Sequence, residues 1–167
     1  KDITVYVKAT QGGMKLHAWN ASGDLTSGDE KLTDVILVKD CAWYRKTFTN
    51  QNRLSFLVYH DEIGTYKSND FTNVSSDIFV TYVDDNGNRY LTNNTADYSG
   101  YTPAWFEQGE VCAFFEVPNG WTDKWYNIYA YASGYTNEGR GDKCDFLGYN
   151  ASGYQIWKWT CTKANVT

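Results

Sequence analysis

Two rings that could recognise a ligand stand two positions apart, at His17 and Trp19, within residues 15–22. In an extended strand, alternate side chains point to opposite faces, so Leu16 and Ala18 would face a core while His17 and Trp19 face outwards. An exposed tryptophan leaves a large apolar area in water. A flat ring beside a hydrogen-bonding ring suits a ligand with an apolar face and a polar edge, such as a sugar. The alternative is that a loop or the second half of the chain covers Trp19.

A second pair of rings has the same spacing. Tyr129 and Tyr131 alternate with Ile128, Ala130 and Ala132, so the two tyrosines would share one face of a strand. By analogy with nucleic-acid bases stacked on aromatic rings, each stacked sugar would contribute on the order of 1–3 kcal/mol. Two such sites on one rigid unit would raise the avidity for a polymer. The alternative is that these tyrosines pack between two halves of the chain.

The residues that catalysis would need form no recognisable set. The chain has no Gly-x-Ser-x-Gly nucleophile motif. Its carboxylates are scattered, and pairs such as Asp61 with Glu62, or Glu107 with Glu110, are no more than any acidic surface offers. We therefore expect a protein that is not an enzyme.

Metal binding has equally little support. The four cysteines lack a Cys-x-x-Cys spacing and only two histidines occur, which argues against a zinc site. Residues 84–88 begin like a calcium loop, but Thr95 stands where that loop needs a bidentate glutamate. Asn86-Gly87 between strand-like segments instead predicts a hairpin turn. We expect no metal and no cofactor.

The composition favours strands and argues against two kinds of partner. Aromatic residues make up 17% of the 167 residues, while proline occurs only twice. Tyrosine and tryptophan with many small polar residues are typical of strands joined by turns. The net charge of −5 argues against nucleic acid and against an anionic membrane surface, whereas a neutral polymer is indifferent to it. No stretch approaches the roughly 18 consecutive apolar residues of a membrane span.

Alternation of apolar and polar residues predicts an all-β chain with few helices. The expected strands are residues 3–9, 15–21, 34–39, 42–49, 53–60, 77–83, 111–117, 125–133 and 154–161. The order of strand, glycine turn and aromatic strand then recurs faintly in the second half. We expect a complete unit over residues 1–84 and a shorter, partial repeat over residues 85–167 that packs on the first as one compact unit. Three tryptophans are assigned to the core: Trp43, Trp157 and Trp159.

The cysteines leave two alternatives open. Cys41, Cys112, Cys144 and Cys161 could form two disulfides in an exported domain, with three possible pairings, or remain four reduced thiols. The chain also begins abruptly in a strand pattern. We therefore expect a piece of a longer, exported protein.

Several short motifs resemble the starch-binding carbohydrate-binding modules of families 25 and 26. Val-Tyr-Val-Lys-Ala followed by Leu-His-Ala-Trp-Asn is similar to the opening of these modules. Phe-Leu-Val-Tyr-His-Asp at 56–61, Gly-Thr-Tyr-Lys-Ser-Asn at 64–69 and Asp-Ile-Phe-Val at 77–80 resemble the family 25 segment. Asn-Gly-Trp at 119–121 and Ile-Tyr-Ala-Tyr-Ala at 128–132 resemble the family 26 opening. The resemblance covers roughly residues 3–83 and 111–159.

The resemblance implies an antiparallel, immunoglobulin-like β-sandwich that binds α-1,4-linked glucan without cleaving it. Such modules belong to amylases or to bacterial cell-surface proteins. This implies a secreted or surface-bound monomeric unit of a larger multidomain protein, with a polysaccharide as partner. The positions that match the family's binding residues are His17, Trp19, Tyr66, Asn69, Tyr129 and Tyr131.

One departure from the families concerns the loop after the aromatic strand. That loop often reads Trp-Pro-Gly in the families, but here it reads Thr26-Ser27-Gly28. A third ring at this place is therefore in doubt. The rival interpretations are a lectin-like module for another glycan and a structural or adhesive β-domain whose aromatic residues are all buried.

Overall fold

The computed structural model describes residues 1–60, 67–118, 120, 127–137 and 139–163. The described chain is nearly all strand, with one short helix, α1, at Thr95–Tyr98. The strands are β1 (Ile3–Lys8), β2 (Met14–Asn20), β3 (Gly23–Asp24), β4 (Glu30–Lys31), β5 (Val35–Val38), β6 (Cys41–Phe48), β7 (Leu54–His60), β8 (Phe71–Val74), β9 (Ile78–Asp85), β10 (Asn88–Asn93), β11 (Cys112–Val117), β12 (Tyr129–Ala130), β13 (Asp142–Lys143), β14 (Asp145–Tyr149) and β15 (Gln155–Thr160). The prediction of an all-β chain is confirmed.

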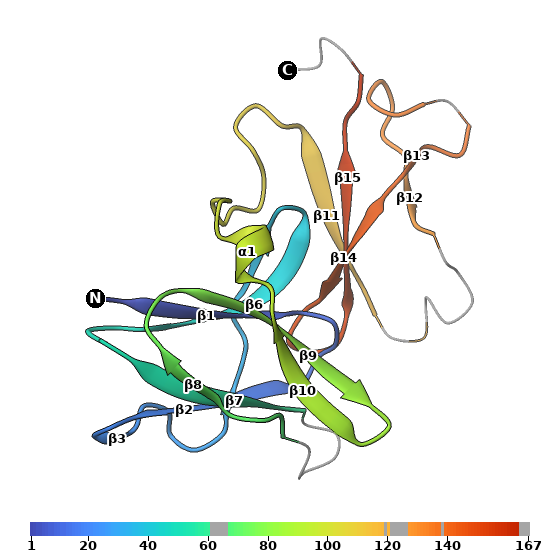
Figure 1. Ribbon diagram of the computed structural model, residues 1–167. Helices are drawn as coiled ribbons and strands as arrows, with labels where there is room; N and C mark the ends of the chain where they lie inside the picture. Colours follow the sequence, from blue (N-terminus) through green and yellow to red (C-terminus); the bar gives the residue numbers. More distant parts are fainter. Residues whose placement is uncertain (61–66, 119, 121–126, 138, 164–167) are drawn as a thin grey trace.

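Two sheets pack face to face to form a β-sandwich (Figure 1). One sheet, which we call the front sheet, has the order β10-β9-β1-β6-β5. The other, which we call the back sheet, has the order β3-β2-β7-β8 with β4 also paired to β2. Alternate residues of each sheet point inwards, among them Val5 and Val7 from β1 and Leu16 and Ala18 from β2. All strand pairs in the two sheets are antiparallel except β1 with β9. The predicted sandwich is confirmed, with this one parallel pair as an addition.

An aromatic cluster covers the outer face of the front sheet. Tyr6 stacks on Phe79 with ring centroids 4.2 Å apart, and Trp43 meets Phe79 edge to face at 5.1 Å. Tyr98 from α1 closes over Trp43 at 4.8 Å, and Trp105 packs against the same group. Trp43 is therefore fully buried, as predicted. The cluster covers the middle of this outer face, while Thr47 on β6 and Tyr90 on β10 stay exposed.

A third sheet, β11-β15-β14, stands at one end of the sandwich (Figure 1). One face turns Phe114, Leu147 and Ile156 into the core of the sandwich. The other face carries Trp157 and Trp159, which pack under the short β12–β13 ladder and are buried as predicted.

The division of the chain at residue 84 stays a prediction. β10 lies beyond this boundary, yet it pairs with β9 and extends the front sheet.

Hydrogen bonds to backbone carbonyls hold the junction between the sandwich and the third sheet. Tyr149 donates its amide N–H to the carbonyl of Ala9 at 2.9 Å. The buried Tyr44 hydroxyl lies 2.8 Å from the Gln11 carbonyl and 2.9 Å from the Asn150 carbonyl, and donates to this pair. Burial raises the pKa of Tyr44 far above its usual value, so the hydroxyl keeps its proton. One side chain thus joins a turn from each half.

Three further expectations have outcomes in the structure. β9 and β10 form a two-residue hairpin through Asn86 and Gly87, both with positive φ, as predicted. All four cysteines are free thiols, so the alternative of two disulfides is wrong for this structure. Among the described residues, no helix has the length and apolar character needed to cross a bilayer.

A half-buried ion pair also joins the third sheet to the sandwich. The Lys158 ammonium on β15 lies 2.8 Å from the Glu110 carboxylate and 3.6 Å from that of Asp40, in the turn between β5 and β6. Burial alone would raise the pKa of Glu110, but hydrogen bonds from Lys158 and from the Glu107 backbone hold it below its usual value of 4.5. The charged form of Glu110 therefore stabilises the fold.

We predict that Glu110→Gln lowers the free energy of unfolding at pH 7 by about 1.5–3 kcal/mol, because a hydrogen bond between charged groups is lost. A depressed carboxyl pKa contributes stability above its unfolded value and loses it as the pH falls through its folded value. The difference between wild type and variant should therefore shrink as the pH drops below about 4.5. Urea unfolding at pH 7 and pH 3.5 measures this. A difference that is constant with pH would contradict the assignment.

Candidate functional site

The outer face of the back sheet presents side chains from β2 and β7 to solvent. Three cross-strand pairs share this face: Lys15 opposite Tyr59, His17 opposite Leu57, and Trp19 opposite Ser55. The intervening Leu16 and Ala18 are buried in the core, so the predicted orientation of β2 is confirmed. Trp19 is half-buried and is not sealed by a loop.

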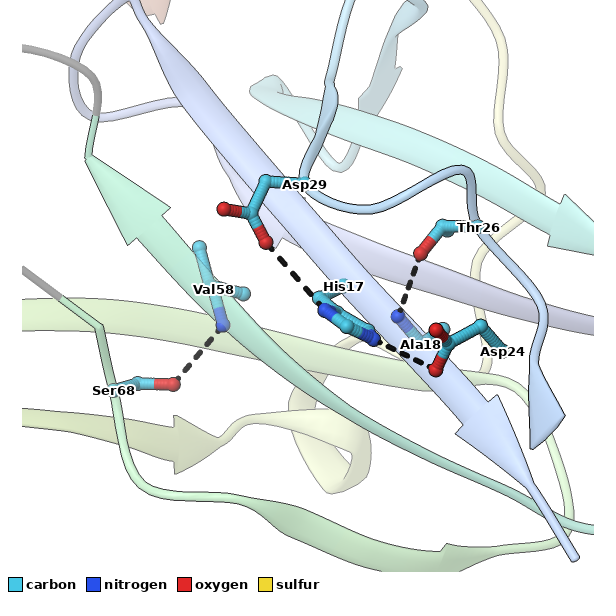
Figure 2. A network of polar contacts seen from close by, with 7 residues as sticks. All are labelled: His17, Ala18, Asp24, Thr26, Asp29, Val58 and Ser68. Carbon is cyan, nitrogen blue, oxygen red and sulfur yellow. Dashed lines mark hydrogen bonds and ion pairs between the residues drawn. The ribbon is translucent and has the colours of Figure 1, made fainter. Parts of the chain in front are cut away.

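His17 lies between two carboxylates (Figure 2). Its Nε2 is 3.0 Å from Asp24 Oδ1, and its Nδ1 is 3.5 Å from Asp29 Oδ1. The imidazole also meets Trp19 edge to face, with centroids 5.6 Å apart and planes at 87°. Both ring nitrogens thus have partners within the chain, which the sequence interpretation did not foresee. The contact with Trp19 orients the indole.

Asp29 links His17 to the neighbouring strand. Burial raises the pKa of Tyr59, and the charge and hydrogen bond of the Asp29 carboxylate raise it further. The polar contacts therefore run from Tyr59 through Asp29 and His17 to Asp24. They tie the loop that follows β2 to the face on which Trp19 lies.

Two buried hydroxyls fix the loops at either edge of this strand pair (Figure 2). Thr26 Oγ1 accepts the N–H of Ala18 at 3.1 Å, and Ser68 Oγ accepts the N–H of Val58 at 3.1 Å. Each hydroxyl accepts a backbone N–H that has no partner on a neighbouring strand. Thr26 is buried, so at the place where a third ring was in doubt this loop carries a hydrogen-bonded anchor.

A hollow of about 570 Å³, which we call the Trp19 hollow, opens at the end of this face. It is lined by Trp19, Asn20, Ala21, Ser22, Asn50, Gln51, Asn52, Arg53, Leu54, Ser55 and Asn73. Its volume is in the range of small-ligand sites. One aromatic ring and a concentration of amides give it a flat apolar wall and a polar rim.

Hydrogen bonds arrange the amides before any ligand arrives. Asn20 Nδ2 donates to Gln51 Oε1 at 2.9 Å, and Gln51 Nε2 donates to the Thr49 carbonyl at 3.0 Å. Asn20 Oδ1 accepts the N–H of Ser22 at 2.8 Å. These bonds join the turn after β2 to the turn before β7.

The exposed rim of the hollow comes from Asn50, Asn52, Arg53 and Asn73. Sequence reasoning missed these residues. The signal was the run Asn50-Gln51-Asn52, three amides in one turn.

Two other residues predicted for the site, His17 and Asn69, do not line this hollow. The Asn69 side chain accepts the N–H of Leu91 at 3.0 Å, so it ties its loop to β10. Tyr66 lies outside the described residues. Among the side chains that are described, no group of three or more histidines, cysteines or carboxylates is arranged to hold a metal ion.

Tyr129 in β12 and the nearby Tyr131 face solvent. Their exposed fractions are 43% and 64%, which excludes the alternative that they are packed between the halves. Tyr129 lines a second, mainly apolar hollow of about 500 Å³ with Phe115, Glu116, Val117, Pro118 and Ile128, which we call the Tyr129 hollow. The Arg140 guanidinium lies 6.0 Å from the Tyr129 ring centroid.

Comparison with known proteins yields one structural match. No protein-family model matches the sequence, and no curated protein matches it. Among solved structures, the chain is similar to the crystal structure of a family CBM26 module, CBMbc, from Eubacterium rectale Amy13K in complex with maltoheptaose. The match has 16% sequence identity and a TM-score of 0.35, and covers 96% of this chain and 75% of that chain.

The hydroxyl of Thr26 provides a test of how the site is held. We predict that Thr26→Val destabilises the protein by about 1–3 kcal/mol, because the buried N–H of Ala18 loses its acceptor. Amide exchange at residues 24–29 should become faster. Thr26→Ser keeps the hydroxyl and serves as the matched control. Equal stability of the valine and serine variants would contradict the role of this hydrogen bond.

Proposed function

We propose that the chain is a non-catalytic carbohydrate-binding module that binds α-1,4-linked glucan, as in starch and maltooligosaccharides. It acts as a monomeric unit of a larger, secreted or cell-surface protein. The observation that carries the proposal is the half-buried Trp19 at the wall of a hollow whose rim is built from amides.

The chemistry of the Trp19 hollow fits a sugar better than other small ligands. The apolar C–H face of a pyranose stacks on an indole, while its hydroxyls both donate and accept hydrogen bonds. Amides offer both roles in one group, and Asn52 and Asn73 stand at the rim for this purpose. Arg53 is the one charged side chain among the described residues that line the hollow. The other lining residues are uncharged, so the hollow favours a neutral ligand over one that carries several charges.

His17 acts in this proposal as a positioning residue. Its nitrogens are held by Asp24 and Asp29, and its ring edge fixes the indole of Trp19. A ring held in its bound orientation loses little conformational entropy when a ligand stacks on it.

The Tyr129 hollow is the second platform of the proposal. Tyr129 and Tyr131 are exposed rings on the far side of the third sheet, and the resemblance to family 26 falls on the same residues. Two platforms on one rigid unit give a polymer two points of attachment, so avidity compensates for modest affinity at each.

Two rival functions predict different ligands and a different exposure of the aromatic residues. A lectin-like module would bind another glycan and ignore starch. A structural or adhesive β-domain would bury its aromatic residues, but Phe106, Tyr129, Tyr131 and Phe146 are among the exposed ones.

We predict that Trp19→Ala weakens binding of amylopectin by roughly 5- to 150-fold, the loss expected for one stacked ring. Affinity electrophoresis in gels that contain amylopectin measures this, with parallel gels that contain a soluble β-glucan. Phe106→Ala removes an exposed ring outside both hollows and is the matched control. Retardation by the β-glucan alone would favour the lectin-like alternative, and unchanged retardation of Trp19→Ala would refute this placement of the site.

We predict that Tyr129→Ala reduces retardation on polymeric starch more than it reduces binding of maltotriose. The reason is that the second platform acts through avidity, which a short ligand bound at one site does not use. Calorimetry with maltotriose and electrophoresis with amylopectin separate the two effects. The proposal of a second platform fails if both readouts for Tyr129→Ala equal those of the wild type.

A further inference from the structure

A third hollow, of about 550 Å³, lies where the two halves of the chain meet. It is lined by Thr10, Gln11, Gly12, Gly13, Lys31, His60, Tyr149, Ala151, Ser152 and Gly153. We call it the junction hollow. We propose that it is a further saccharide-binding site, separate from the Trp19 and Tyr129 hollows and assembled only when the third sheet packs on the sandwich. The ligand class rests on the proposed function above, but the site and its residues are separate from it.

The floor of the junction hollow is a close contact between two turns. Gly12 lies so near Gly153 that a Cβ at position 12 would come 2.4 Å from the Gly153 nitrogen. Gly13 donates its N–H to the Ala151 carbonyl at 3.3 Å, and the Tyr44 hydroxyl bridges the carbonyls of Gln11 and Asn150. Any side chain larger than hydrogen at position 12 would drive the two turns apart.

The turn between β14 and β15 is also held from within. Asn150 Oδ1 accepts the N–H groups of Ser152 and Tyr154, at 3.0 Å and 2.9 Å. Because both turns are fixed by hydrogen bonds, the hollow exists before a ligand binds. Binding then requires little ordering of the protein.

The walls combine a supported ring with polar groups of several kinds. The Tyr149 ring is half-buried and meets Phe146 edge to face at 5.5 Å, which fixes its orientation. The other lining residues include His60, Lys31, Thr10 and Ser152, whose side chains offer an imidazole, an ammonium group and two hydroxyls. A flat ring with donors and acceptors beside it suits a polyhydroxylated ring, as in the Trp19 hollow.

The position of the hollow makes it distinct from the first site. Met14 pairs with His60 at one end of the β2–β7 ladder, and Trp19 pairs with Ser55 at the other. The two ends are five residue steps apart along β2, which corresponds to roughly 17 Å. The two hollows share no lining residue. Ligand sites occur often where two units of a protein meet, and here both halves supply the walls.

The test uses maltoheptaose as the probe and backbone amide NMR shifts as the readout, in the wild type and in Trp19→Ala. The inference predicts that Tyr149, Ala151 and Ser152 shift on titration in both proteins. The proposed function predicts that Asn20, Gln51 and Ser55 shift in the wild type. Shifts in the second set alone overturn this inference and leave the proposed function intact. Shifts in the first set alone support the inference and overturn the function at Trp19, and shifts in neither overturn both.

Variants then assign the contact. In the Trp19→Ala background, Tyr149→Ala should weaken junction binding by roughly 5- to 150-fold, while Tyr149→Phe keeps the stacked ring and most of the affinity. Lys31→Ala changes an exposed side chain without risk to the core and should weaken binding about 2- to 10-fold. Tyr154→Ala removes an exposed ring of the same turn outside the hollow and should have no effect. Equal affinities for all four variants would overturn the inference.

Discussion

The aromatic cluster of Tyr6, Trp43 and Phe79 covers the middle of the outer face of the front sheet and thereby creates a difference between the two sheets. The rings lie 4.2 Å and 5.1 Å apart under Tyr98, so they offer a ligand no stacking surface. Among the described residues, no such aromatic cluster covers β2 and β7, and their outer face carries ion pairs and one half-buried indole beside the buried Leu57. A sandwich must bury both inner faces, and this chain buries the middle of one outer face as well. Within the sandwich itself, the outer face of β2 and β7 therefore keeps room for binding chemistry.

Side-chain hydrogen bonds, more than strand ladders, determine the shape of that face. Thr26 accepts an N–H of β2 and Ser68 accepts an N–H of β7, each at a position where the strand has no strand partner on that side. Asn20 and Gln51 join two turns through their amides. Such bonds contribute modestly to stability when formed, but leaving a buried partner unpaired is costly. They therefore restrict the turns to one arrangement, and a rigid hollow binds a ligand with little loss of entropy.

The period of two in the sequence predicted β1, β2, β5, β6, β7, β9, β11 and β15, together with the direction of His17 and Trp19. It missed β8, β10 and β14, which lie in segments without clear alternation, and of the strand expected at 125–133 the described residues show only Tyr129–Ala130. It could not predict which side chains meet across turns. Asn20, Gln51 and Asn73 are far apart in the chain and come together only because β2, β7 and β8 are neighbours. For the same reason the two carboxylates at His17 were not foreseen. The period of two describes one strand at a time, whereas these contacts depend on the register between strands.

The third sheet cannot be understood as an independent second copy. It has only three strands, and Phe114, Leu147 and Ile156 on one of its faces complete the core of the sandwich. Removed from the sandwich, that face would be exposed to water, and Tyr44 would lose one of the two carbonyls that its hydroxyl bridges. The halves are therefore held together by burial and by polar contacts at the same place. Rings on both halves then keep fixed relative positions, which is the condition under which separate weak contacts with one polymer reinforce each other.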